Sequence, residues 1–121
     1  MTGAPVLSEL ERYLSLTNKR ETVIAANMAN IDTPGYHTQD FDFGQALQHA
    51  MAGLPFGADP AATSVRLRNV GGLLERPDGN NVDLDRESML LSEVQLQAQM
   101  GTQLMKAHFH QLLTAINGGG Q

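Results

Sequence analysis

The first long helix of this chain has to end within the stretch Asn27-Met28-Ala29-Asn30-Ile31-Asp32-Thr33-Pro34-Gly35-Tyr36. Thr33 precedes a proline, and this pushes its backbone out of the helical region. Pro34 has a fixed φ and no N–H to donate, whereas Gly35 can adopt a positive φ at little steric cost. The pair suits the central positions of a type II turn that begins at Thr33 and ends at Tyr36. The sequence therefore predicts that a helix stops here and that the chain turns.

Residues 5–31, which lead into this turn, have the apolar periodicity of a long helix. Apolar side chains recur at steps of three or four residues, if Thr17 and Glu21 are accepted as polar interruptions. The resulting stripe consists of Leu7, Leu10, Leu14, Ile24, Met28 and Ile31. A second set of apolar residues lies off that stripe, namely Val6, Tyr13, Leu16 and Val23. A helix with apolar residues on more than one face is expected to have more than one neighbour.

A second long helix is predicted at the other end of the chain. It begins near Asp83 or Asp85, both good N-caps, and runs to about Asn117. Its apolar stripe consists of Leu91, Val94, Ala98, Gly101, Met105, Phe109, Leu112 and Ile116. A glycine inside a helix costs about 1 kcal/mol relative to alanine. Gly101 therefore either allows close approach of another backbone or is simply tolerated.

The segment between the two helices, residues 36–82, is rich in proline and glycine. Asp42 is a helix-start signal and Gly53 a stop signal, so a short helix is predicted near residues 43–52. Residues 65–68 alternate between apolar and charged side chains, which favours a half-exposed strand. We interpret the rest of this segment as irregular, partly ordered and fixed mainly by its neighbours.

The predicted fold class is therefore mainly α, with two long antiparallel helices, N- and C-terminal, that form a coiled-coil pair around an irregular, partly ordered middle segment. We expect one structural unit in three parts: the helix and Thr-Pro-Gly turn at 1–35, the middle at 36–82, and the helix and Gly-rich tail at 83–121. Such a pair leaves an outer apolar face uncovered on each helix, and faces of this kind mark interfaces. The alternative is a monomeric hairpin with some exposed Leu and Met.

The charge distribution excludes several classes of function. The net charge of −5 lies entirely within residues 32–87, where nine acidic residues face four arginines, and both predicted long helices are close to neutral. No basic footprint for nucleic acid is present. No apolar run is long enough to span a bilayer, and the N-terminus lacks the pattern of a cleavable signal. Export by a machine that reads uncleaved N-terminal segments stays open.

Catalytic and metal-binding signals are weak. The chain has no cysteine and no motif for a nucleophile, a phosphate loop or a zinc site. His108 and His110 are two positions apart on a helix and would point about 200° apart. His37 and His49 lack a recognised ligand spacing, and the run at residues 78–83 has its glycine at the wrong place for a calcium loop. We therefore expect no enzyme activity, no metal and no cofactor.

Two runs resemble a known family. Asn27 and Asn30, followed by Thr33-Pro34-Gly35-Tyr36, resemble the N-terminal signature of bacterial flagellar axial proteins, the subunits of the rod and the hook. The second run, which enters the C-terminal helix, is most similar to the proximal rod proteins of that family and reads Asp78-Gly79-Asn80-Asn81-Val82-Asp83-Leu84-Asp85-Arg86-Glu87.

This resemblance implies a structural subunit of the proximal rod of the flagellar basal body, located in the periplasmic space. It also implies export through the flagellar type III apparatus, helical self-assembly, and a role in torque transmission and motility. The implied partners are copies of the chain, other flagellar rod proteins, the adaptor FliE, the export gate and the inner-membrane ring. Three alternatives stay open: another short rod protein, a helical export chaperone or adaptor that binds partner helices, and a small peptidoglycan hydrolase.

The resemblance also assigns roles to particular residues. The amides of Asn27 and Asn30 would hydrogen-bond backbone groups of the turn or of a neighbouring subunit, although asparagine also favours helix ends for simpler reasons. Phe43 and Leu47 lie four positions apart, on one face of the predicted short helix. They resemble the Phe-x-x-x-apolar gate-recognition element of early rod and hook export substrates. The alternative is that this helix packs its apolar face within the folded protein.

Overall fold

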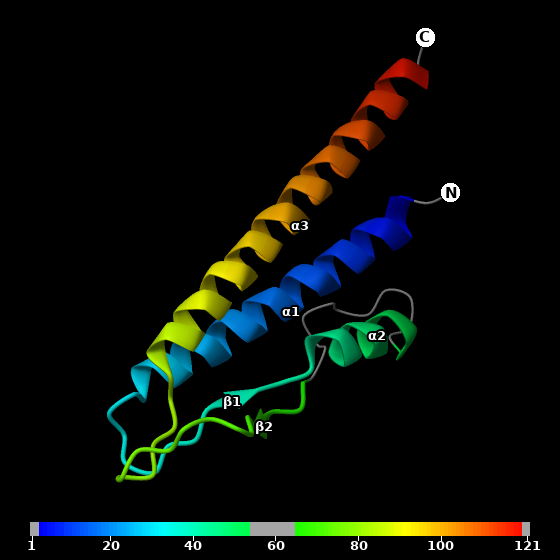
Figure 1. Ribbon diagram of the computed structural model, residues 1–121. Helices are drawn as coiled ribbons and strands as arrows, with labels where there is room; N and C mark the ends of the chain where they lie inside the picture. The colour runs from blue at the N-terminus through cyan, green and yellow to red at the C-terminus, as the bar shows by residue number, and fades with distance from the viewer. Residues whose placement is uncertain (1–2, 54–64, 120–121) are drawn as a thin grey trace.

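The computed structural model of the protein describes residues 3–53 and 65–119. Its elements, in chain order, are α1 (Gly3–Ala29), β1 (Gln39–Asp40), α2 (Phe43–Gly53), β2 (Arg68–Asn69) and α3 (Leu84–Gly119). Helices α1 and α3 lie side by side and run in opposite directions, and α2 packs against α1 (Figure 1). The predicted fold class, two long antiparallel helices with an irregular middle, is confirmed.

The ends of the helices follow from local chemistry. α1 ends at Ala29, two residues before the predicted end, because the hydrogen bonds tighten to three-residue steps there. The N–H of Ile31 donates to the Met28 carbonyl at 3.3 Å, and that of Asn30 is shared between the carbonyls at positions 26 and 27. A tightened last turn of this kind closes a helix rather than extending it.

The two helices that follow begin at side-chain caps. Asp83 is the N-cap of α3, because its Oδ1 accepts a hydrogen bond from the Arg86 N–H at 3.2 Å. Asp42 has the same role for α2, with its Oδ1 3.0 Å from the Gln45 nitrogen. Of the two caps proposed for the C-terminal helix, the structure therefore uses Asp83.

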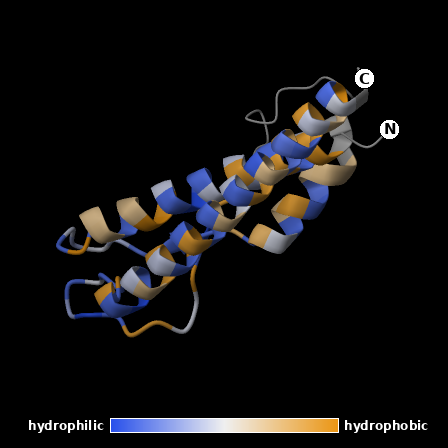
Figure 2. Cartoon of the chain, turned by 90° about the horizontal axis from the view of Figure 1, so that it is seen from above, coloured by the Kyte–Doolittle hydropathy of each residue, from blue (hydrophilic) through white to orange (hydrophobic). Residues whose placement is uncertain are grey.

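The contact between α1 and α3 includes members of both predicted stripes together with Leu90, which lies outside them. Its buried centre consists of Ile24, Leu90 and Val94, with Met28 and Leu91 packed beside them. Further along the stripes, the half-buried members are Leu7, Leu10, Leu14, Ile31, Ala98, Met105 and Leu112. Two members of the α3 stripe are exposed instead: Phe109 at 55 % and Ile116 at 69 %. Figure 2 shows hydrophobic residues along the long helices, up to the C-terminal end of α3.

The second apolar face of α1 packs against α2, as the residues off the main stripe predict. Leu16 is completely buried there, together with Phe41 and Ala50. Surrounding this cluster are Val23, Phe43, Ala46, Leu47 and Val65. Burying a leucine of this kind stabilises a fold by about 1.5–3 kcal/mol relative to leaving it in water. Helix α2 and Val65, both from the middle segment, therefore pack into the core of their own chain.

Two short strands within the middle segment, β1 and β2, pair as an antiparallel ribbon. β1 and β2 pair with Gln39 opposite Asn69 and Asp40 opposite Arg68. The predicted strand at 65–68 is thus displaced toward its C-terminal end. The physical reason is that β1 ends at Asp40, after which the chain turns into α2, so that among the described residues no strand lies beside residues 65–67.

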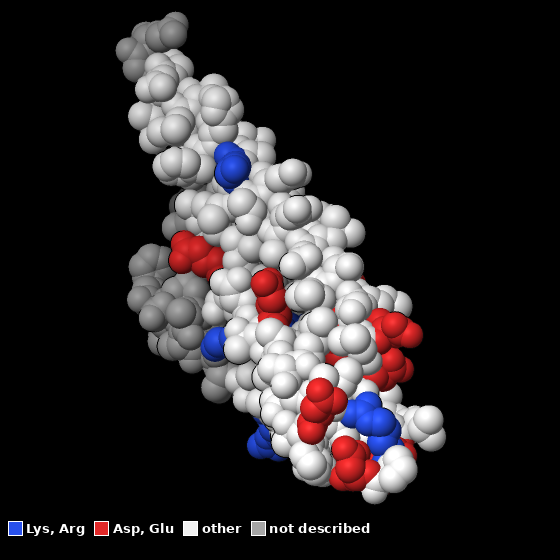
Figure 3. Space-filling model, turned by 90° about the vertical axis from the view of Figure 1, so that its left-hand side faces the viewer, with Lys and Arg blue, Asp and Glu red and all other residues white. Residues whose placement is uncertain are grey.

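Charge is unevenly distributed over the face of the molecule that Figure 3 shows. On the face shown in Figure 3, acidic and basic side chains cluster at the lower end, and the upper part is almost free of charge. From residue 88 onward the chain has only Glu93 and Lys106. Within residues 3–53 and 65–119, no helix has both the length and the apolar character that crossing a membrane would need.

Gly101 is buried on the side of α3 that faces α1. A Cβ at this position would lie 3.0 Å from Leu14 Cδ2 and 3.1 Å from Tyr13 Cδ2, which is tighter than ordinary contact. The glycine therefore makes room for side chains of α1, which distinguishes it from a glycine that is merely tolerated.

We expect Gly101→Leu to separate α1 from α3 and to destabilise the protein by about 1–2 kcal/mol, because overpacking outweighs the gain in helix propensity. Thermal unfolding followed by circular dichroism measures this. Ala107→Leu, on an exposed position of the same helix, is the matched control and should change stability by less than about 0.5 kcal/mol. Equal melting temperatures for the two variants would contradict the close approach.

Candidate functional site

The side chain of Asn27 lies at the meeting point of α1, the turn, β1 and α3, with 1 % of its surface exposed. Its Nδ2 donates to the Gln39 carbonyl at 2.8 Å and to Glu87 Oε1 at 2.7 Å. Its Oδ1 accepts from the Tyr36 hydroxyl at 3.1 Å and from the Gln39 N–H at 3.0 Å. An amide can donate two hydrogen bonds and accept two, so Asn27 uses its full capacity.

Glu87, in the first turn of α3, is completely buried. Besides the bond from Asn27, its Oε2 lies 2.6 Å from Arg86 Nη1. An isolated buried carboxylate would be strongly unfavourable, whereas a carboxylate with an amide donor and a guanidinium is well stabilised. The positive end of the helix dipole adds to this. Glu87 therefore depends on Asn27, which lies 60 positions earlier in the chain.

Tyr36 completes the shell around Asn27. Burial, and then the charge of the nearby Glu87 carboxylate, raise the pKa of the Tyr36 hydroxyl above its ordinary value of 10.0. The hydroxyl therefore stays protonated at neutral pH and continues to donate its hydrogen bond to Asn27.

Asn80 holds the end of α1 from the other side of the turn, and it is completely buried. Its Nδ2 donates to the carbonyl oxygens of Asn30 at 2.9 Å and Thr33 at 2.8 Å. Its Oδ1 accepts from the N–H of Val82 at 2.8 Å. Each of these carbonyls also accepts a backbone N–H, from Thr33 and from Tyr36 respectively, so Asn80 adds a second donor to each and ties the turn to the chain before α3.

The neighbouring Asn81 ties the chain after the turn to the chain before α3. Its Oδ1 accepts from the Thr38 N–H at 2.7 Å, and its own N–H donates to the Tyr36 carbonyl at 3.2 Å. Thr38 is completely buried and Asn81 nearly so. Residues 36–38 and 80–82 thus run beside each other, and hydrogen bonds between them satisfy their buried polar groups.

Two glycines let these segments touch. The Tyr36 N–H donates to the Thr33 carbonyl at 3.1 Å and Gly35 has a φ of +76°, as a type II turn beginning at Thr33 requires. The Gly35 N–H in turn donates to the Asp78 carbonyl at 2.8 Å. Gly79 has a φ of +87°, and a Cβ there would lie 3.3 Å from Gly35 Cα. Both positions therefore require glycine, Gly35 by conformation and Gly79 by conformation and space.

The remaining signature residues are bonded within the turn. Asn30 Nδ2 donates to the Ala26 carbonyl at 2.7 Å, and Asn30 Oδ1 accepts from the Thr33 hydroxyl at 2.9 Å. The guanidinium of Arg76 donates to the Ile31 carbonyl. Both signature asparagines thus bond groups of their own chain, and Pro34 lies exposed at the tip. We call the whole assembly, Asn27 to Tyr36 with Arg76 to Glu87, the junction.

The structure brings together the two runs that resemble the flagellar family, residues 27–36 and 78–87. The candidate site is formed by the contacts between them. The resemblance marks the run that contains Asn80, Asn81 and Glu87, and the helix dipole favours Glu87 in the first turn, but neither predicts that the three side chains are buried. The signal that could have found them is the concentration of amides and acids beside a helix start. Phe43 and Leu47 lie apart from the junction and pack in the Leu16 cluster.

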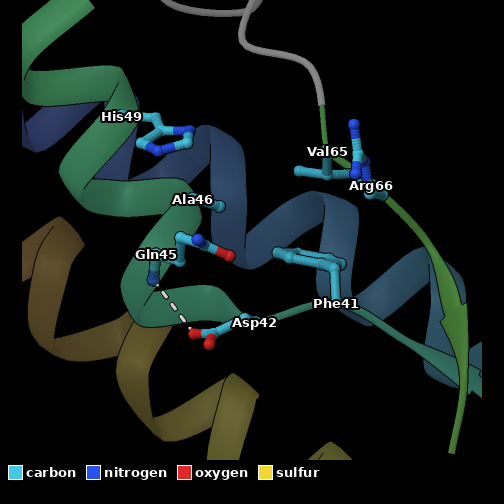
Figure 4. A pocket seen from close by; sticks show the side chains of 7 residues that line it. All are labelled: Phe41, Asp42, Gln45, Ala46, His49, Val65 and Arg66. Carbon is cyan, nitrogen blue, oxygen red and sulfur yellow. Dashed lines mark hydrogen bonds between the residues drawn. The ribbon is translucent and has the colours of Figure 1, made fainter.

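One cavity of about 540 Å³ lies between α2 and the segment that precedes β2 (Figure 4). It is lined by Phe41, Asp42, Gln45, Ala46, His49, Val65 and Arg66. The carboxylate of Asp42 already caps α2. Among the residues that the structure describes, no three His, Cys, Asp or Glu side chains come together as a metal site. The junction, with its polar groups satisfied internally, is built to hold segments in place.

We expect Asn27→Asp to destabilise the protein by about 3 kcal/mol or more, because it removes both amide donors and places a second carboxylate beside a buried one. Chemical denaturation at pH 7 measures the loss. Asn18→Asp, on an exposed position of the same helix, is the matched control and should be within about 0.5 kcal/mol of the parent. A loss shared equally by both variants would show that charge on α1, rather than the junction, is responsible.

Comparison with known proteins places the chain in a family, although no family model matches it. The flagellar basal body rod protein FlgB of Salmonella typhimurium is 31 % identical over 125 residues, which cover 90 % of this chain and 91 % of that protein. The FlgB of Bacillus subtilis is 31 % identical over 121 residues, covering 93 % and 94 %. That of Aeromonas hydrophila is 33 % identical over 117 residues, covering 87 % of each. Since these similarities extend over nearly the full length of both partners, the chain belongs to the family of the flagellar basal body rod protein FlgB.

Proposed function

We propose that this chain is a structural subunit of the proximal rod of the bacterial flagellar basal body, where it assembles helically and transmits torque for motility. Membership in a family of basal body rod proteins supports the rod assignment. The observation that carries self-assembly is the apolar stripe of α3, which continues past its contact with α1 and leaves Phe109 and Ile116 exposed. An uncovered stripe of this kind is typical of a surface that another protein covers.

The junction gives such a subunit the stiffness that its task needs. Torque passes through a rod only if each subunit resists bending between its two long helices. The fully bonded amide of Asn27 and the buried Glu87 oppose that bending, because opening the angle would leave both unpaired in the interior. We propose that the three parts of the chain, 1–35, 36–82 and 83–121, act as one structural unit for this reason.

We further propose that the chain reaches the periplasmic space through the flagellar type III apparatus. Its partners there would be copies of itself, other rod proteins, the adaptor FliE, the export gate and the inner-membrane ring. The proposal includes no catalysis, no cofactor and no nucleic acid. The acids and amides of the junction support this reading, because they already bond to groups of the chain itself.

Isolated basal bodies test the assignment directly. An epitope-tagged chain that complements a deletion strain of the source bacterium should copurify with the rod and be visible there by immunoelectron microscopy. A tagged chain that stays in the cytoplasm, as an export chaperone would, overturns the proposal.

We expect Gly35→Val to abolish swimming while leaving the amount of protein in the cell near normal. A β-branched residue at positive φ costs about 1–3 kcal/mol, and the resulting error in the turn is repeated at every subunit of a polymer. Soft-agar motility and immunoblotting measure the two effects. Gly71→Val is the matched control, since Gly71 has open space around it and no positive φ. Normal swimming of the Gly35 variant would contradict the role of the turn.

The proposed export element is packed in the folded chain. The ring of Phe43 meets that of Tyr13 edge-on, with centroids 5.6 Å apart, and Leu47 packs against the cluster that contains Leu16. A gate could read these side chains only before α2 folds onto α1. We propose that export precedes folding and that the same two residues later serve the core.

We expect the double variant Phe43→Ala, Leu47→Ala to remain in the cell and to disappear from the culture medium of a strain that lacks the partners for rod assembly. Immunoblotting of cells and medium measures the partition. Leu16→Ala is the control, because it weakens the same cluster but leaves the proposed element intact. If both variants are secreted alike and only motility fails, Phe43 and Leu47 are purely structural.

A further inference from the structure

An apolar groove lies between the three helices, near the end of the molecule opposite the junction. Its volume is about 270 Å³. It is lined by Val6, Glu9, Leu10, Tyr13, Met51, Met100, Gly101 and Leu104. Glu9 is the only charged residue among them, and Met100 and Leu104 are exposed at 56 % and 58 %. Methionine-rich apolar grooves adapt well to the side chains of a docking helix.

The C-terminal part of α3 offers a matching set of side chains. Phe109, Leu113 and Ile116 are exposed at 55 %, 44 % and 69 %. They follow the spacing i, i+4 and i+7, which places them on one face of the helix and is the pattern by which an amphipathic helix fills a groove. No Asp, Glu, Lys or Arg occurs between residues 107 and 117.

This set cannot fill the groove of its own chain. α3 is one continuous helix from Leu84 to Gly119, so its C-terminal part cannot fold back. Met100 and Phe109 are nine positions apart and therefore point to nearly opposite sides of the helix. The groove and the apolar set thus face different directions. A helix that fills the groove therefore has to come from another molecule.

The charges indicate that this other molecule is a second copy. Lys106 lies three positions before Phe109 and seven before Leu113, on the same face as the apolar set. It is exposed, and it is the only cation after residue 88. The groove contributes one carboxylate, Glu9, which is also exposed. A helix docked through Phe109 and Leu113 therefore brings one positive charge to a groove with one negative charge.

We propose that the exposed face formed by Phe109, Leu113 and Ile116 of one copy docks into the apolar groove between the three helices of the next copy. This inference rests on the proposed self-assembly and specifies which surfaces meet. The contact joins two different patches, so it is head-to-tail, and such contacts produce open helical polymers when the rotation does not close a ring.

Disulfide crosslinking tests the contact, because the native chain contains no cysteine. Met100→Cys and Leu113→Cys are introduced into separate, differently tagged copies that are expressed in one strain. Isolated basal bodies are then oxidised with copper–phenanthroline. We expect a disulfide-linked dimer that carries both tags. The matched control pairs Met100→Cys with Thr114→Cys, an exposed neighbour that points about 100° away from Leu113.

The outcomes separate this inference from the proposed function. A dimer at least tenfold more abundant in the Leu113 pair than in the Thr114 pair supports the contact. Both tags in the basal body with equal or absent crosslinking overturns the contact and leaves the rod assignment standing. Absence of both tags from the basal body defeats the rod assignment and the contact with it. As a second measurement, Leu113→Glu should lose incorporation and Thr114→Glu should keep it, and equal incorporation overturns the contact.

Discussion

The buried pair of Asn27 and Glu87 is the interaction on which the rest of this structure depends. The amide satisfies one oxygen of a carboxylate that has no exposure to water, and the carboxylate holds the start of α3 against the end of α1. Neither partner is favourable inside the protein without the other, because each would leave an unmet hydrogen-bonding group in a low-dielectric interior. The relative placement of the two long helices is thus coupled to one contact, and the Tyr36 hydroxyl and the Gln39 backbone make that contact rigid.

The two ends of the molecule are built on opposite principles. At the junction, buried amides and backbone groups bond to one another within the chain, and charged residues surround them. At the other end, α3 extends with apolar side chains and almost no charge. A polar interior with every partner in place specifies a single geometry, whereas an apolar surface gains free energy from burial by a neighbour. A rod subunit needs both properties: a fixed shape, and faces that neighbours cover.

The family signature acquires a physical meaning from this arrangement. The Thr-Pro-Gly-Tyr turn and the Asp-Gly-Asn-Asn run are two halves of one contact, in which Gly35 and Gly79 approach so closely that a side chain on Gly79 would touch Gly35. Asn80 donates to two carbonyls of the turn, and Asn81 aligns the two segments. A residue that looks like a loop asparagine in either run is therefore a buried structural group, and its replacement affects the helix of the other run.

The sequence by itself determined whatever depends on near neighbours. Helix stripes, the caps at Asp42 and Asp83 and the Gly35 turn arise from interactions over a few residues, so periodicity and side-chain chemistry predict them. Tertiary structure alone decided which polar groups are buried together and which apolar face is left uncovered. Asn27 and Glu87 lie 60 positions apart, and no local pattern pairs one amide with one acid among many. The strand lies further along the chain than the sequence pattern predicts, because its partner β1 ends just before α2 begins. The exposure of Phe109 follows from where α1 begins, since α3 extends past that point (Figure 1). These features depend on distances in space, which a pattern along the chain does not contain.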